Sequence, residues 1–529
     1  MTHDYVAIEA RRRQVQGRLD SLKSQRERNE RGQFATPPFL AQQMAEYVRE
    51  LWKERLDRIR FLDPAVGTGS LYSALRATVT QDAIVGATGV ELDDVVADAS
   101  TELWAETGLN VLKADFTRLT PPDDKARFNL ILTNPPYVRH HHLDRFEKLR
   151  LKRLSAGALG GQINGLAGLY CYFMLLSHNW LAPDGLGVWL IPSEFMNVNY
   201  GQALRHYLTT KVTLLRIHRF DPEELQFDDA LVSSAIVVLR KAVPDVSHEP
   251  ILSYGGLLIQ PRQEERVALP DLVHSHKWSA LPTADRRVGT AAMPKTVTLS
   301  DVFSVKRGVA TGANSFFVLP KDEAARRGIT DRFLKPILPS PRYLNQAVVE
   351  SDNGGYPLID RPLALIDTDL PREEIKRLCP PLWDYLKEGE RAGLKDKYLL
   401  AKRSPWYKQE YRAPAPFLCT YMGRGGNERH PFRFFWNKSQ AVAPNVYLLL
   451  YPAGALGETL RTSPQHLRTV FDLLQSIDPA ALIKEGRVYG GGLYKLEPRE
   501  LGRVSALDFV EKFGLRIEPA AIQGSLALS

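Results

Sequence analysis

The sequence is poor in cysteine and has no long apolar run. Its only cysteines, Cys171, Cys379 and Cys419, lie far apart and follow no metal-binding spacing. Such spacing excludes a disulfide framework, and it fits a reduced, cytosolic setting best. No apolar run is long enough to span a bilayer, and the charged N-terminus has no signal-peptide core. Without repeats or low-complexity tracts either, we expect an ordinary cytoplasmic globular protein that makes no contact with a membrane.

The charge of the chain is nearly balanced. Lys and Arg number 69 against 61 Asp and Glu, which gives a net charge of +8. This excess favours a polyanionic partner, although over 529 residues it also fits an ordinary solvated surface. The length predicts two or three domains. We place a first domain over residues 1–245, a Pro- and polar-rich connector over 246–297, and a second domain over 298–529.

One short motif ends a buried strand. Residues 128–133 are rich in Leu and Ile, and Pro135 and Pro136 stop the run. In open α/β sheets, ligands lie beyond the carboxyl ends of the strands. There, the Asn134 side-chain oxygen and the Pro135 carbonyl can accept both hydrogens of an exocyclic amine, while Tyr137 stacks on the attached ring. Taken alone, the motif fits an ordinary strand-ending turn equally well.

Three further strands are predicted upstream of this motif. The strand over residues 60–63 leads into a turn with only Gly67 and Gly69, short of the full dinucleotide fingerprint. The strand over 84–90 ends in Glu91, which is placed to hold a ribose diol. A third strand ends in Asp115 and Phe116, which suit an adenine amino group and ring face. Strands alternating with helices predict a doubly wound α/β sheet that holds an adenosyl cofactor.

Five short motifs together resemble a known family. Phe34–Pro37, Asp63–Gly69, Glu91, Asp115 and Asn134–Tyr137 occur in the order of the gamma-class N6-adenine DNA methyltransferases. The resemblance covers roughly residues 30–240 and is strongest to the TaqI-like type II modification methylases. It implies a class I S-adenosylmethionine-dependent methyltransferase fold, Rossmann-like and doubly wound, followed by a C-terminal mixed α+β target-recognition domain.

The resemblance also assigns roles to residues. The S-adenosylmethionine pocket would be lined by Thr36, Asp63, Pro64, Ala65, Gly67, Gly69, Glu91, Leu92, Asp115, Phe116 and Pro136. Asn134, Pro135 and Tyr137 would hold the extruded adenine, with Phe227 facing Tyr137 across the base. The product would be S-adenosylhomocysteine, and no metal is required. His140–His142 do not indicate a metal site, because adjacent side chains point in different directions.

Basic and aromatic stretches indicate contacts with DNA. Residues 306–317 and 486–496 resemble the family's target-recognition region and combine cations with glycines and aromatics. The predicted DNA contacts are Arg139, His140, Lys306, Arg307, Thr311, Asn314, Arg487, Tyr489 and Lys495. A β-rich domain with an aromatic core remains an alternative for this half. For the N-terminal helix over residues 5–31, we favour a solvated face over phosphate contacts.

The sequence therefore predicts a monomeric methyltransferase that modifies adenine N6 in double-stranded DNA. A separately encoded restriction endonuclease is the expected companion. Methylation of RNA adenine and a non-catalytic DNA-binding subunit on a methyltransferase fold remain alternatives. Methylation of release-factor glutamine would not need so large a basic second domain. A fused nuclease is disfavoured, because the region before Phe34 is short and no nuclease motif is evident elsewhere.

Overall fold

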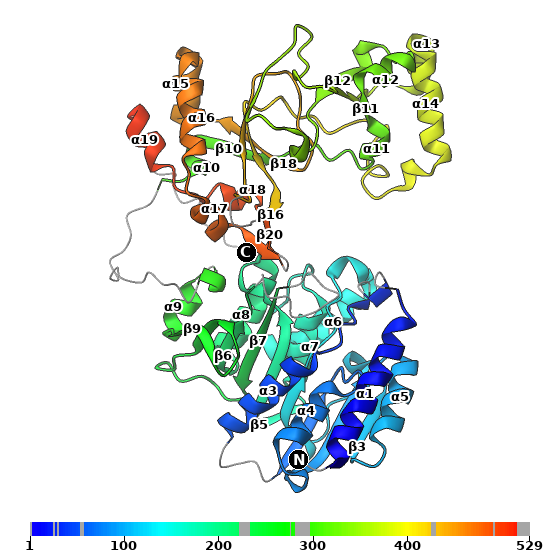
Figure 1. Cartoon of the computed structure of the whole chain (residues 1–529), viewed down its shortest axis with the longest axis vertical. Coiled ribbons are helices and arrows are strands. Elements are labelled where there is room, and N and C mark those ends of the chain that lie inside the picture. The colour runs from blue at the N-terminus through cyan, green and yellow to red at the C-terminus, as the bar shows by residue number, and fades with distance from the viewer. Residues whose placement is uncertain are drawn as a thin grey trace, which may run out of the picture. The chain divides into compact units, whose positions relative to one another are not determined.

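The computed structural model describes residues 3–24, 27–28, 31–52, 58–221, 233–275, 277–280, 297–424, 430–489 and 492–515. The chain divides into two compact units, one of residues 1–289 with 489–491 and one of residues 290–488 with 492–529, and many of their elements are labelled in Figure 1.

The first unit is built on one mixed sheet. Among its described residues, nine strands pair in the order β3-β2-β1-β4-β5-β7-β6-β8-β9. The strands are β1 (Ile59–Asp63), β2 (Ile84–Glu91), β3 (Leu109–Lys113), β4 (Phe128–Thr133), β5 (Leu181–Pro192), β6 (Thr213–Arg219), β7 (Ser234–Arg240), β8 (Ile251–Gly256) and β9 (Pro261–Arg266). From β3 to β5 neighbouring strands are parallel, and β7 runs antiparallel between β5 and β6. The predicted doubly wound sheet is confirmed.

Helices cover both faces of this sheet. They are α1 (His3–Ser21), α3 (Pro38–Leu51), α4 (Ser70–Thr78), α5 (Asp94–Trp104), α6 (Arg145–Leu159), α7 (Leu169–Ser177), α8 (Gln202–Thr210) and α9 (Leu269–His274). Leu130 and Leu132 of β4 belong to the core under α3, α4 and α5, whereas Ile131 belongs to the core under α6, α7 and α8. Period-two alternation thus buries both faces, which explains the continuous apolar run of β4.

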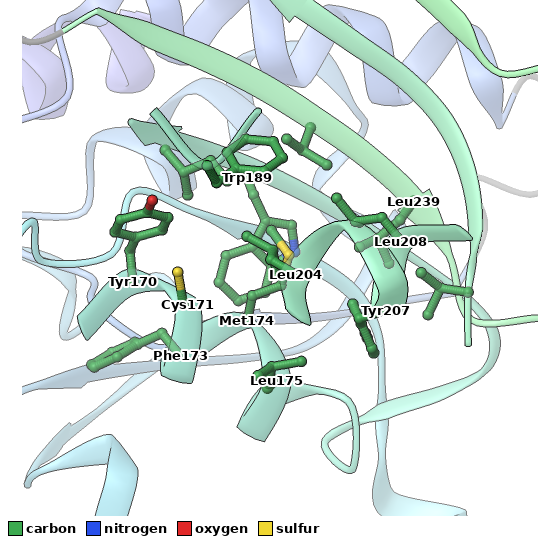
Figure 2. Close-up of a cluster of buried hydrophobic side chains, with 14 of the residues drawn as sticks. Tyr170, Cys171, Phe173, Met174, Leu175, Trp189, Leu204, Tyr207, Leu208 and Leu239 are labelled. Carbon is green, nitrogen blue, oxygen red and sulfur yellow. The ribbon is translucent and has the colours of Figure 1, made fainter. Parts of the chain in front are cut away.

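The core on the α7 side is tightly filled. Figure 2 shows side chains of α7 and α8 meeting those of β5 and β7. Cys171 and Leu204 have no exposed surface, and Trp189 is 2% exposed. Full burial of one such side chain contributes about 1.5–3 kcal/mol. The apolar helix α7 therefore lies in the core, with Tyr170 to Leu175 all buried.

The predicted connector over residues 246–297 is wrong for residues 251–280. β8 pairs in parallel with β6, β9 pairs antiparallel with β8, and Leu272 and Trp278 are buried in the core. β9 escaped notice because its sequence, PRQEER, is an exposed edge and lacks apolar alternation. One of its acids has a partner on β6, since Glu264 Oε2 lies 2.8 Å from a terminal nitrogen of the buried Arg216.

The N-terminal helix also differs from expectation. α1 ends at Ser21, earlier than predicted, and it packs against α4 and α5. Arg12 is 2% exposed, and its guanidinium binds the carboxylate of Glu9 over 2.8 Å. Ser73 of α4 donates to the same carboxylate over 2.6 Å. The solvated interpretation holds for Arg11 and Arg13, which are exposed, but it is wrong for Arg12, because Arg12, Glu9 and Ser73 satisfy one another beneath the helix.

The second unit is mixed α+β, as predicted. Its described strands form a five-stranded sheet in the order β10-β18-β15-β17-β13 and two three-stranded sheets, β11-β14-β12 and β16-β20-β19. The strands are β10 (Phe303–Arg307), β11 (Val318–Pro320), β12 (Leu334–Ile337), β13 (Val348–Val349), β14 (Leu363–Ile366), β15 (Phe417–Thr420), β16 (Met422–Arg424), β17 (Phe434–Asn437), β18 (Tyr447–Pro452), β19 (Arg487–Tyr489) and β20 (Leu493–Lys495). The helices are α10 (Leu299–Val302), α11 (Asn314–Phe317), α12 (Lys321–Arg326), α13 (Arg372–Leu378), α14 (Pro380–Arg391), α15 (Gly454–Thr462), α16 (Leu467–Gln475), α17 (Pro479–Glu485), α18 (Pro498–Leu501) and α19 (Leu507–Phe513). In the part of the chain that the structure describes, no helix is long and apolar enough to cross a membrane.

Candidate functional site

A cavity of about 520 Å³ opens at the carboxyl ends of β1 to β4. Residues that follow each of these strands line it, as the open-sheet rule predicts. From the set singled out in the sequence, the lining contains Pro64, Ala65, Gly67, Glu91, Leu92, Asp115, Phe116, Asn134 and Pro136. Four strands far apart in sequence therefore bring their tips to one site.

Two predicted pocket residues shape the first turn without lining the cavity. Asp63 is buried, and its carboxylate accepts hydrogen bonds from the Ala65 N–H (3.0 Å) and the Thr133 hydroxyl (2.6 Å). Burial raises the pKa of Asp63 to about 7. Gly69 has a φ of 81°, and a Cβ there would lie 2.4 Å from the Trp104 ring nitrogen. Only glycine fits that close approach.

Glu91 stands at the tip of β2 with a largely buried carboxylate. One oxygen accepts the Asp93 N–H over 2.8 Å, and the other accepts the Gly67 N–H over 3.1 Å. Burial raises the pKa of Glu91, and the two backbone donors oppose that rise. Each oxygen still has a lone pair, so the carboxylate can accept further hydroxyl groups from a ligand in the cavity.

Asp115 follows β3 and is fixed by the residues after it. Its Oδ1 accepts from the Thr117 N–H (2.9 Å) and hydroxyl (2.7 Å), and its Oδ2 accepts from Arg118 over 3.1 Å. Phe116 packs on Phe173, with ring centroids 5.4 Å apart. The acid and the ring are thus held rigidly where both line the cavity.

The two polar groups of the Asn134 side chain differ, because its NH2 group has hydrogen-bond partners and its Oδ1 has none among the described residues. Its side-chain NH2 donates to the Phe34 carbonyl over 2.9 Å and to the Thr36 hydroxyl oxygen over 3.2 Å. These two acceptors fix the amide orientation, which points Oδ1 the other way. Oδ1 is buried and has no hydrogen-bond donor among the described residues. A buried acceptor without a partner is costly, so the site is suited to receive a donor.

The segment before α3 packs directly on the Asn134 turn. The Tyr137 N–H donates to the Gly32 carbonyl over 3.1 Å, and Gly32 has a φ of 64°. A Cβ on Gly32 would lie 2.5 Å from the Tyr137 nitrogen, so this approach requires glycine. The Tyr137 ring is 7% exposed, 5.6 Å from the Phe34 ring, and its hydroxyl donates to the Leu190 carbonyl over 3.1 Å. The structure therefore places this ring in the core beside the cavity.

Sequence reasoning missed one wall of the cavity. Gln16, Leu19, Asp20 and Lys23 line it from α1 and the residues just after it. Arg12 anchors α1 to the glycine turn, since its guanidinium donates to the Thr68 hydroxyl over 3.1 Å. No motif marks these residues, because the helix is largely polar and its few apolar side chains form only a thin stripe.

Asp93, just after β2, links the residues that follow α1 to the carboxyl end of this strand. Its carboxylate pairs with Lys23 and accepts from Arg31 over 3.4 Å. Burial alone would raise the pKa of Asp93, but the contact with Lys23 and the hydrogen bonds from the Val96 N–H and Gln33 together lower it. The same carboxylate accepts the Val96 N–H and caps α5. Asp93 follows Glu91 closely in sequence, yet only the structure reveals this second role.

One acid of the cavity lining has no cationic partner among the described residues. The charged lining residues are Asp20, Glu91, Asp93, Asp115 and Glu147 with Lys23, Arg28 and Arg31. Lys23 is paired with Asp93, and Arg28 Nη1 lies 3.6 Å from Asp20 Oδ1. Asp115 and Glu147 pair with Arg118 and Arg150, which leaves the Glu91 carboxylate without an ion pair.

Several of the predicted site residues do not line the cavity or are not described by the structure. Phe227 falls outside the described residues. Arg139 is exposed and His140 is half-buried; burial first, and then the charge of Lys148, lowers the pKa of His140. Among the described residues no three His, Cys, Asp or Glu side chains gather in a way that could hold a metal ion. Pro135 is buried between the two cavity-lining residues Asn134 and Pro136.

In the second unit, three of the predicted cations lie over tyrosine rings. The Arg307 guanidinium lies 4.0 Å from the centre of the Tyr421 ring, and the Lys495 ammonium lies 5.1 Å from it. Lys306 lies 5.8 Å from the Tyr451 ring. Lys495 also pairs with Glu497 over 2.8 Å, whereas Lys306 and Arg307 are exposed. The cation–π contacts of Lys306 and Arg307 orient these side chains while leaving their charge available to phosphates.

The remaining predicted contacts have structural partners. Thr311 is 1% exposed, its hydroxyl hydrogen-bonds Asn314, and it accepts the Ala313 N–H over 3.2 Å. Thr311 therefore stabilises the turn, and only the exposed Asn314 faces solvent. Arg487 pairs with Glu500 over 2.7 Å, and Tyr489 is half-buried at the end of β19.

The sheet order, with an antiparallel β7 and ligand-side residues at the tips of β1 to β4, defines the class I S-adenosylmethionine-dependent methyltransferase fold. Residues 75–226 match the family model described as Eco57I restriction-modification methylase. Residues 275–514 match that of the type II methyltransferase M.Eco57I, C-terminal domain. The chain belongs to this family of type II restriction–modification methyltransferases.

Curated relatives extend the match across both units. The chain is 28% identical over 495 residues to the type II methyltransferase M.AccI of Acinetobacter calcoaceticus, covering 90% of this chain and 85% of that protein. It is 27% identical over 462 residues to M.XamI of Xanthomonas campestris pv. amaranthicola, covering 84% and 80%. Among solved structures, the type IIL restriction-modification enzyme MmeI in complex with DNA has a TM-score of 0.55 at 13% identity. That likeness, over 88% of this chain and 64% of MmeI, supports the fold alone.

Proposed function

We propose that this protein transfers a methyl group from S-adenosylmethionine to the N6 amino group of an adenine flipped out of duplex DNA. One observation carries the proposal: Asn134 lines the cavity with a buried Oδ1 that has no donor among the described residues. An exocyclic NH2 would supply that donor. A cytosine N4 amine could do so too, so the choice of adenine rests on the resemblance of the motifs.

The cavity fits the cofactor in size and in chemistry. Glu91, whose carboxylate has no ion pair among the described residues, can accept ribose hydroxyls, and Asp115 with Phe116 can hold an adenine edge and face. When bound, S-adenosylmethionine supplies an electrophilic methyl group. Neither a metal nor a covalent nucleophile is required of the protein.

The residues around Asn134 would activate the amine by geometry. Phe34 and Thr36 hold the Asn134 amide so that Oδ1 accepts one N–H, and the Pro135 carbonyl would accept the other. Two such bonds draw the nitrogen lone pair out of conjugation with the ring, and fixed acceptors require no reorganisation during transfer. The target base must leave the stack to reach this turn, at a cost of a few kcal/mol.

The second unit would select the site on DNA. Lys306 and Arg307 are exposed cations that lie over tyrosine rings, which suits contacts with backbone phosphates. The match of residues 275–514 to the C-terminal domain of the type II methyltransferase M.Eco57I adds support. A separately encoded endonuclease and a monomeric state are part of the same proposal.

The test is methylation of unmodified DNA by the purified full-length chain, followed by nucleoside digestion and mass spectrometry. We expect N6-methyldeoxyadenosine at one sequence, with Asn134→Ala inactive. Methylcytosine would overturn the choice of base. Methylation of an RNA substrate in preference to the duplex would overturn the choice of nucleic acid.

A further inference from the structure

Helix α6 follows the Asn134–Tyr137 turn closely in sequence, and its two faces differ sharply. Asp144 caps its start, accepting the Glu147 N–H over 2.8 Å. The inner face contacts the segment 115–117 after β3, which lines the cavity and is called the cofactor-side loop below. The Arg150 guanidinium donates to the Thr117 carbonyl over 2.7 Å and to the Thr117 hydroxyl oxygen over 2.6 Å. Glu147 itself lines the cavity. The inner face therefore anchors α6 to the cofactor-side loop.

The outer face is basic and apolar at once. α6 contains Arg145, Lys148, Arg150, Lys152 and Arg153 against a single acid, Glu147, which is bound to Arg118 and Arg150. None of the other four cations has an acidic partner among the described residues. Arg145 and Arg153 are exposed, and Lys148 and Lys152 are half-buried.

Apolar side chains share this outer face. Phe146 is 83% exposed, more than any other large apolar side chain among the described residues, and Leu149 is 45% exposed. At 100° per residue, Arg145, Leu149, Lys152 and Arg153 fall on one side of the helix, with Phe146 at its margin. An exposed phenylalanine among cations without partners is unusual for a solvated face.

We propose that the outer face of α6 is a DNA-docking surface that binds the backbone beside the flipped adenine, with Arg145 and Arg153 on phosphates and Phe146 against an adjoining sugar or base. The inference rests on the proposed function. Charge complementarity selects the occupant, because cations without partners suit a polyanion and an apolar ring suits the surface of an opened base step. Through Arg150 and Thr117, α6 would also link cofactor binding to DNA binding.

The test compares two double variants of the full-length chain by filter binding of cognate duplex at several salt concentrations. Arg145→Gln with Arg153→Gln should lower the slope of log K against log salt by up to about 1.8, or about 0.9 for each phosphate that the variant no longer neutralises. The matched control is Lys125→Gln with Arg240→Gln. Both of those residues are exposed cations at the opposite, amino edge of the sheet, and their removal should leave the slope unchanged.

Phe146→Ala provides an independent measurement. It should weaken binding about 5- to 30-fold without changing the salt slope, because it removes a contact that is not electrostatic. Thermal unfolding of every variant should match that of the wild type. If it falls while the salt slope stays unchanged, another part of this chain covers α6 and the inference is wrong.

The outcomes separate this inference from the proposed function. If the wild type binds and methylates DNA but the α6 pair keeps the wild-type slope, only the docking surface is overturned. A wild type that neither binds nor methylates duplex DNA would overturn both. A slope change with RNA alone would likewise overturn the DNA surface.

Discussion

The Asn134 side-chain NH2 donates to the Phe34 backbone carbonyl over 2.9 Å, across 100 residues of sequence. A backbone acceptor cannot be altered by the Phe34 side chain, so the amide orientation is fixed by the path of the chain itself. The segment that leads into α3 and the tip of β4 therefore build the reactive position together.

Replacement of Asn134 by Ala should abolish most methyl transfer. The variant loses the proposed acceptor for the amine but leaves Glu91, Asp115 and Phe116 in place. We expect kcat to fall roughly 100- to 1000-fold, as when one preorganised hydrogen-bonding group is removed from a transition state. Cofactor affinity, measured by calorimetry, should stay nearly unchanged.

Asn129 is the matched control for this variant. It lies at the start of β4, where its side chain accepts from the Arg60 N–H (2.7 Å) and donates to the Arg58 carbonyl (2.8 Å). Asn129→Ala should lower the free energy of unfolding by about 1–3 kcal/mol and leave kcat intact. Near-normal turnover by Asn134→Ala would show that Asn134 has been assigned wrongly.

Two substitutions of Tyr137 should distinguish the contribution of its ring from that of its hydroxyl group. Burial raises the pKa of Tyr137, so the hydroxyl stays protonated and donates to the Leu190 carbonyl. Tyr137→Phe should lower the free energy of unfolding by about 1 kcal/mol and keep most of kcat. Tyr137→Ala also loses the ring beside Phe34 and should lower stability by about 3–5 kcal/mol.

Chemical denaturation and single-turnover methylation measure the two effects independently. If stacking on the base is the role of the ring, methylation by Tyr137→Ala should stay low even at a temperature where the variant is fully folded. Equal damage to turnover by Phe and Ala would indicate a chemical role for the hydroxyl.

Much of this site could be predicted because its residues are local to strand ends. Glu91, Asp115 and Asn134 each follow an apolar run directly, and the open-sheet rule brings such positions together without knowledge of the packing. The wall formed by α1 could not be predicted in this way. Its buried Glu9–Arg12 pair looks in sequence like a solvated i, i+3 pair, and only the packing against Ser73 removes it from water.

The edge strands β8 and β9 escaped prediction for a related reason. The polar pattern of β9 is explained by a partner on another strand, since Glu264 meets Arg216 of β6. Long-range pairs of this kind leave no periodic signal within a short window. In the same way, burial of the Tyr137 ring beside Phe34 depends on the close approach of Gly32, which the sequence alone does not reveal.

Asp63 should make the fold less stable as the pH rises. Burial raises its pKa to about 7 in the folded chain, whereas an unfolded Asp titrates near 3.9. Between about pH 4 and pH 7 the folded state holds the extra proton, so this group lowers stability by up to about 1.4 kcal/mol per pH unit. Asp63→Asn removes the effect.

The difference in unfolding free energy between Asp63→Asn and the wild type should therefore rise from about pH 4 to pH 7 and then level off. Urea denaturation at several pH values measures it. Parallel curves for Asp63→Asn and the wild type would mean that Asp63 titrates normally in the folded chain.

Asp93→Asn should loosen the N-terminal wall of the cavity. Asparagine keeps the cap on α5, but it loses the charge that pairs with Lys23 and Arg31. The dissociation constant for S-adenosylmethionine should rise roughly 3- to 10-fold, corresponding to about 1 kcal/mol for a partly buried ion pair. At saturating cofactor, kcat should not change.

Asp94→Asn is the neighbouring control. Asp94 pairs with Lys113 over 3.3 Å in solvent and does not line the cavity, so its loss should leave cofactor affinity unaltered. If the two variants weakened cofactor binding equally, general charge near α5 would control binding, and the pairing of Asp93 with Lys23 and Arg31 would not.

Two N-terminal fragments should behave differently because β8 completes the sheet. Ser253 of β8 lies 3.1 Å from both the Arg216 guanidinium and the His218 ring of β6. A fragment ending at Lys241 lacks β8, which leaves these buried groups without that partner and exposes the edge of β6. It should melt earlier or aggregate, whereas a fragment of residues 1–280 should bind S-adenosylmethionine as tightly as the full chain.

The 1–280 fragment also tests whether the first unit binds the cofactor while the second unit recognises the DNA sequence. It retains Asn134 and the whole cavity but lacks Lys306, Arg307 and Lys495. Filter binding of cognate and scrambled duplexes at several salt concentrations should show weak binding without discrimination. If the fragment distinguished the two duplexes as well as the full chain does, sequence recognition would belong to the first unit, and the recognition role proposed for residues 298–529 would be wrong.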